Sequence, residues 1–134
     1  MKYYRTISLL LAFVFALVGL FFLFLSDGVL TFFNSIATYA GMKQSPVNAI
    51  NFYLILASGY MYVVTLLACL MYRHPDNQYF PLLLTNAKLA SSVLSLGFFL
   101  LHQPYLIYIT NFIVDGSIGM LVLYFYFKIK KGQP

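Results

Sequence analysis

The sequence predicts an all-α fold, an integral membrane four-helix bundle of up-down-up-down topology with a short amphipathic interfacial helix between its first two spans. Of the 134 residues, 62% are hydrophobic and only 8% are charged, whereas soluble domains carry about 25% charged residues. Four apolar runs are each long enough to cross a bilayer, which takes about 20 residues. Because the connections between them are short, residues 1–134 are expected to form a single transmembrane domain.

The four predicted spans are bounded by charged residues and by turn or helix-start signals. The first follows a basic segment and is longer than the hydrophobic stretch of a signal peptide, about 7–15 residues, so we expect a retained helix. Ser45 and Pro46 favour a helix start, with the hydroxyl as N-cap and proline at the first helical position. Turn residues around His74 and Pro104 separate the later spans. The predicted spans are 7–26, 46–72, 81–101 and 105–127.

A shorter amphipathic segment, residues 28–40, follows the first span. Its apolar residues recur at helical spacing, with polar residues between them: Val29, Phe32, Phe33, Ile36 and Ala40. We expect a helix that lies in the membrane interface, with Asp27 as its N-cap and Gly41 at its end. The alternative is an ordered loop without a helix.

Basic residues mark the ends of the spans and predict the orientation of the chain. With four spans, one side carries six basic residues and the other carries only Lys43; the six are Lys2, Arg5, Arg73, Lys128, Lys130 and Lys131. The positive-inside rule therefore places both termini in the cytoplasm, and we expect a prokaryotic inner membrane. The basic ends would contact anionic lipid headgroups rather than nucleic acid.

Two ionisable residues fall inside the predicted spans. Lys88 lies about 10 Å from the cytoplasmic end of the third span and Asp115 about 18 Å from that end of the fourth, at a rise of ~1.5 Å per residue. A charge at the centre of the bilayer costs at least about 2.5–3.5 kcal/mol, so such residues usually face protein, water or each other. If the two helix faces meet, the lysine stem is long enough for an ion pair.

Polar and small residues surround both positions at helical spacing. The predicted polar seam comprises Lys88, Ser92 and Ser95 of the third span, Asn111 and Asp115 of the fourth, and Tyr62 of the second. We expect the first span to face mainly lipid. The alternatives are a seam that serves only helix packing, a Lys88 that snorkels to the surface, a protonated Asp115, or an ion pair with a purely structural role.

Motifs of known chemistry are absent from the sequence. It contains no glutamate, no glycine-rich phosphate loop and no metalloprotease or hydrolase signature. His74 and His102 would lie on opposite sides of the membrane and could not share a metal ion. We therefore predict no catalytic residues, no metal site and no cofactor.

Three classes of function fit this pattern. The first is a non-enzymatic accessory subunit or a binder of a hydrophobic ligand or lipid, with membrane lipids, a larger membrane protein complex or a second copy of the chain as partners. The second is a small oligomeric transporter or channel in which Lys88 and Asp115 line a polar path. The third is a membrane enzyme acting on a lipid or isoprenoid. We expect the first.

The outline of the chain carries one resemblance. Four spans, a lysine and serine stretch around Lys88 in the third, and the Asp115-Gly116 pair in the fourth resemble the DoxX-like group of small prokaryotic membrane proteins. The likeness is one of architecture, which implies a four-helix membrane fold and no particular substrate.

Overall fold

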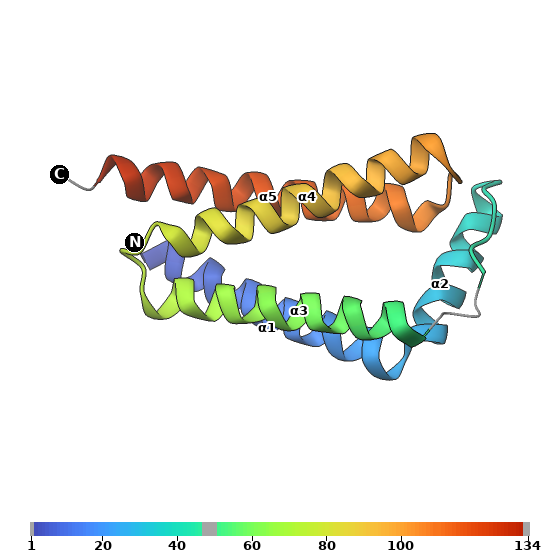
Figure 1. The fold of residues 1–134 in the computed structure, drawn as a ribbon, viewed down its shortest axis with the longest axis horizontal. Helices are drawn as coiled ribbons and strands as arrows, with labels where there is room; N and C mark the ends of the chain where they lie inside the picture. Colours follow the sequence, from blue (N-terminus) through green and yellow to red (C-terminus); the bar gives the residue numbers. More distant parts are fainter. Residues whose placement is uncertain (1, 47–50, 133–134) are drawn as a thin grey trace.

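The computed structural model describes residues 2–46 and 51–132 and confirms the predicted all-helical class (Figure 1). In the described ranges, four helices are long and apolar enough to span a membrane, and a shorter one, α2, stands between the first two of them. The helices are α1 (Lys2–Phe24), α2 (Ser26–Tyr39), α3 (Asn51–Arg73), α4 (Tyr79–Leu101) and α5 (Leu106–Lys131).

The long helices extend beyond the predicted spans at four of their ends, by one residue at Arg73 of α3 and by two or more residues at the other three. α1 already begins at Lys2, and α5 continues to Lys131. The three lysines in the last turn of α5 interact favourably with the negative end of the helix dipole. α4 begins at Tyr79, whose backbone N–H donates to the Asn77 carboxamide at 2.9 Å. Pro81 falls in the first turn of α4, where a missing N–H removes no helical bond. The prediction that Pro46 is the first helical residue of the second span is wrong, because Pro46 is not helical; residues 47–50 lie outside the described residues, and α3 is described from Asn51.

α2 follows α1 after a single non-helical residue, Leu25. The prediction that Asp27 caps this helix is wrong, because α2 begins at Ser26 with Leu25 at the cap position. The Asp27 carboxylate instead lies in the first turn of α2, where it interacts favourably with the positive end of the helix dipole. The helix ends as predicted: Gly41 has φ +66°, and Met42 N–H donates to the Ala37 carbonyl at 2.8 Å, the bond of a Schellman cap.

The long helices pack as two pairs, α1 along α3 and α4 along α5, with fewer contacts between α3 and α4 (Figure 1). The ribbons of the two pairs lie close together near the N-terminus and diverge toward α2, which crosses the wide end and contacts α1 and α5. The linker after α2 is held by Asn34, which donates to the Ser45 carbonyl at 2.7 Å and accepts from its N–H at 2.8 Å.

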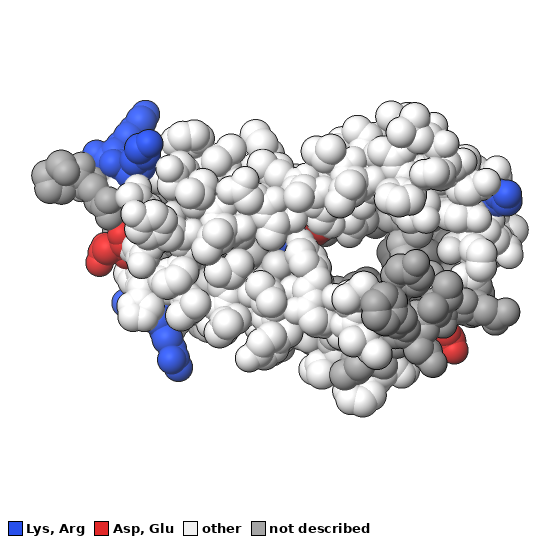
Figure 2. All heavy atoms as spheres, viewed as in Figure 1, with Lys and Arg blue, Asp and Glu red and all other residues white. Residues whose placement is uncertain are grey.

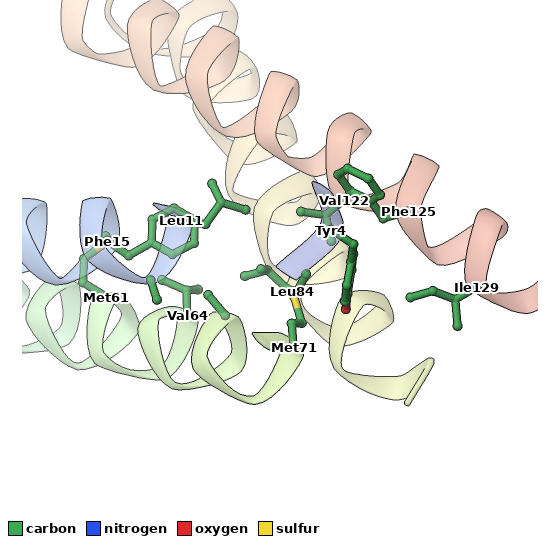
Figure 3. Packing of buried hydrophobic residues seen from close by; sticks show 12 residues of the cluster. Tyr4, Leu11, Phe15, Met61, Val64, Met71, Leu84, Val122, Phe125 and Ile129 are labelled. Carbon is green, nitrogen blue, oxygen red and sulfur yellow. The ribbon is translucent and has the colours of Figure 1, made fainter. Parts of the chain in front are cut away.

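The apolar core fills the narrow end of the bundle. All four long helices contribute to it, including Tyr4 of α1, Met71 of α3, Leu84 of α4 and Val122 of α5 (Figure 3). The outer faces of the same helices expose large apolar side chains, such as Phe13 of α1, which is 66% exposed. Exposed apolar surface on every long helix is what lipid contact requires and what a soluble monomer avoids, so the helices indicate an integral membrane protein.

Charge lies mainly at the two ends of the molecule (Figure 2). Between these ends the visible surface is almost wholly uncharged, with only small areas of blue and red beside an opening in the half toward α2. This distribution agrees with helices that cross an apolar layer.

Candidate functional site

The close approach of α4 and α5 positions the buried charges. A Cβ atom added at Gly119 would lie 2.8 Å from a methyl carbon of Leu89, and one added at Gly116 would lie 2.9 Å from the Ser92 hydroxyl. Small residues at these two positions let the helix backbones approach, as is common between membrane helices. The Ser92 hydroxyl also donates to the Phe112 carbonyl at 2.8 Å, so it fixes the register of the pair.

Lys88 and Asp115 form a buried ion pair. Lys88 Nζ lies 2.8 Å from Asp115 Oδ1, and the two side chains are 3% and 7% exposed. Lys88 therefore does not snorkel to the surface. Breaking a buried pair of this kind leaves an uncompensated charge, so the pair constrains how α4 and α5 pack.

Two aromatic rings flank the Lys88 ammonium group. Its nitrogen lies 4.5 Å from the ring centroid of Phe15 and 5.2 Å from that of Tyr60, within the range of cation–π attraction. The first span was expected to face mainly lipid, and α1 does expose many large apolar side chains, but Phe15 of α1 is only 2% exposed and covers the ion pair. An apolar residue cannot be recognised as part of a polar site when only polar stripes are considered.

The predicted seam residues of α4 and α5 come together. The Asn111 amide donates to the Ser91 hydroxyl at 3.1 Å and to the Ser95 hydroxyl at 2.6 Å. Ser92, which is 3% exposed, lies beside them against α5. Ser91 also lies in the seam, although it is not among the predicted seam residues.

Tyr62 lies apart from this cluster, whereas Tyr60 belongs to it. The Tyr62 side chain is 69% exposed on the outside of α3, while the Tyr60 hydroxyl donates to the Ala87 carbonyl at 3.2 Å. The two tyrosines point about 200° apart on the helix, at about 100° per residue. The sequence signal that would place Tyr60 on the inner face of α3 is its spacing. It lies three residues after Ala57 and four before Val64, and both of these face inward.

A cavity of about 490 Å³ opens from the ion pair into the space between the helix pairs. Lys88, Asp115, Tyr60 and Asn111 line it, and the rest of its wall is mainly apolar, including Phe15, Phe21, Phe33, Met61 and Ile118. Its volume is in the range of small-molecule sites, roughly 300–1,000 Å³. An apolar chamber with a few convergent polar groups can hold an amphipathic molecule.

The described residues contain no group of three or more His, Cys, Asp and Glu side chains that could hold a metal ion. Comparison of the chain with protein-family models, with curated proteins and with solved structures finds no significant match. The resemblance in outline to the DoxX-like group thus gains no support from these comparisons, and function is argued from the site.

Proposed function

We propose that this protein is a non-enzymatic, membrane-embedded binder of a neutral lipid that has a hydroxyl head and a hydrocarbon chain. The observation that carries the proposal is the buried Lys88–Asp115 pair in the wall of a mainly apolar cavity of about 490 Å³. The cavity would hold the chain, and the ion pair would bind the head.

The chemistry of the pair favours an uncharged head. A carboxylate accepts about four hydrogen bonds, and Asp115 receives one from Lys88, so it can accept another from a hydroxyl group. A cationic head would compete with Lys88, and an anionic head would approach the Asp115 carboxylate. Removing a charged head from water to an apolar site costs much free energy. Desolvating a neutral hydroxyl group costs much less.

The length and lining of the cavity favour a hydrocarbon chain. Its wall on α5 runs from Ile107 to Ile118, about 16 Å at a rise of ~1.5 Å per residue. At the wide end it reaches Val29 and Phe33 of α2. The hydrocarbon chain of a ligand lying along α5 would therefore contact the apolar side chains of both helix pairs in place of membrane lipid.

Three probes with the same chain length test the proposal: hexadecanol, palmitate and hexadecyltrimethylammonium, which carry neutral, anionic and cationic heads. We expect native mass spectrometry of the purified protein to show retention of hexadecanol at least about tenfold above the other two. Retention should fall in Ala57→Phe, which adds an aromatic ring to the cavity wall on α3 and leaves Lys88 and Asp115 unchanged. Leu56→Phe is the matched control, because Leu56 is 54% exposed on the same helix.

Three results would contradict this function. Equal retention of all three probes would indicate nonspecific partition into the detergent micelle. Undiminished retention of hexadecanol by Ala57→Phe would place binding outside the cavity. Co-purification of another protein without any bound lipid would instead favour the accessory-subunit alternative.

We further propose that both termini face the cytoplasm of a prokaryotic inner membrane, so that the spans run up-down-up-down and α2 lies in the opposite interface. The support is the six-to-one distribution of basic residues between the two sides. In a Cys69→Ala background, Gln103→Cys should react with a membrane-impermeant maleimide on intact cells. Gly132→Cys should react only after the membrane is opened, and the reverse pattern would overturn this orientation.

A further inference from the structure

A second hollow, of about 420 Å³, adjoins the ligand cavity. It lies along α4 and is lined by Ala90, Leu94 and Phe98 of that helix and by Tyr108 of α5. Tyr60 and Ser91 line both this hollow and the cavity that holds the ion pair. These two side chains therefore form part of the wall that the two spaces share.

Tyr60 is the larger of these two side chains in the shared wall. Its hydroxyl donates to the Ala87 carbonyl at 3.2 Å, which ties the ring of an α3 residue to the backbone of α4. Its ring centroid lies 5.2 Å from Lys88 Nζ, so the shared wall stands at the head end of the proposed ligand. Ser91 is small and is held by the Asn111 amide at 3.1 Å.

We propose that Tyr60 is a specificity-determining residue that restricts the site to lipids with one hydrocarbon chain. This inference rests on the proposed function. A head bound at Lys88 and Asp115 places one chain in the first cavity, and a second chain attached to the same head would have to enter the second hollow. The Tyr60 ring occupies that route.

Monopalmitoylglycerol and dipalmitoylglycerol are suitable probes, because both have neutral heads with at least one free hydroxyl group, and the second acyl chain of the latter replaces one hydroxyl. We expect the wild-type protein to retain the monoacyl probe at least about tenfold better, since even one misplaced methylene in a fitted pocket changes binding by about 10-fold to 200-fold. In Tyr60→Ala the preference should fall to about threefold or less through a gain in the diacyl probe.

Two further substitutions of tyrosine separate the ring from other effects. Tyr60→Phe keeps the ring and removes only the hydroxyl group, with its hydrogen bonds, so it should keep the wild-type preference. Tyr62→Ala removes the same side chain from the outer face of α3 and should also keep it. If Tyr60→Ala does not fold, Tyr60→Leu removes most of the ring area while retaining an apolar side chain, and a reduced preference is expected there.

The possible outcomes distinguish the inference from the proposed function. If the wild-type protein retains neither glycerol lipid nor hexadecanol, the proposed function fails, and with it the role of Tyr60. If it retains the monoacyl probe but Tyr60→Ala or Tyr60→Leu leaves the preference unchanged, only the role of Tyr60 is overturned. An equal change in Tyr62→Ala would also overturn it.

Discussion

Replacing Lys88 alone with methionine is expected to lower the free energy of unfolding by about 3–5 kcal/mol, the usual cost of leaving one partner of a buried ion pair without the other. The Asp115 side chain, which is only 7% exposed, would lose its counter-ion. Unfolding in mixed micelles, followed by helix content or by steric trapping, measures this loss.

The double variant Lys88→Met/Asp115→Leu should recover most of that stability, because well-packed apolar side chains often replace a buried pair without cost. Lys130→Met is the control, since Lys130 is exposed in the last turn of α5 and surface changes are usually within about 0.5 kcal/mol. A double variant as unstable as Lys88→Met would contradict the assignment of the loss to the unpaired charge. A stable double variant also provides a folded protein without the proposed head site.

Replacing Gly119 with leucine is expected to have the second large effect. Even a Cβ atom at this position would lie 2.8–3.4 Å from three atoms of Leu89, one of them its backbone nitrogen, so the Leu89 side chain would have to shift. The rest of the leucine side chain has no room beside it and is expected to push α4 and α5 apart. Overpacking of this kind costs about 1–3 kcal/mol, and here it also separates Lys88 from Asp115. The same unfolding measurement applies, with a loss of bound hexadecanol expected in parallel.

Gly97→Leu is the matched control for this substitution. No atom lies within 4 Å of a Cβ built at Gly97 of α4, and replacing glycine within a helix gains up to about 1 kcal/mol. The variant should therefore be as stable as the wild type or slightly more stable. If Gly119→Leu behaves like Gly97→Leu, then the close approach of α4 and α5 does not limit the fold.

Much of the fold could be predicted because its signals are local. Apolar runs and turn residues predicted four long helices with bounds close to those observed. Gly41 predicted the end of α2, where its backbone is left-handed. The cap of α2 was predicted incorrectly because Asp27 is a good N-cap in isolation, whereas the start at Ser26 depends on how α2 follows α1. Helix pairing depends on tertiary packing, which periodicity alone does not specify.

The candidate site was predictable where a buried charge revealed it. Lys88 and Asp115 were recognised because ionisable residues are costly in a membrane, and their serine and asparagine neighbours followed from helical spacing. Phe15 and Tyr60 were missed for different reasons. Phe15 is one of 14 phenylalanines and has no polar group to mark it, and Tyr60 differs from Tyr62 only in the face that it occupies. The cavity itself arises from the divergence of two helix pairs.

The short turn between α4 and α5 has a consequence for how the chain enters the membrane. α4 ends at Leu101 and α5 begins at Leu106, so Lys88 and its counter-ion belong to one helical hairpin. Either helix inserted alone would carry an uncompensated charge into the lipid, at about 2.5–3.5 kcal/mol on the scale measured for insertion. Inserted together, they enter as an electrically neutral unit. Biogenesis of this half of the protein should therefore depend on keeping the two helices consecutive and joined by a short turn.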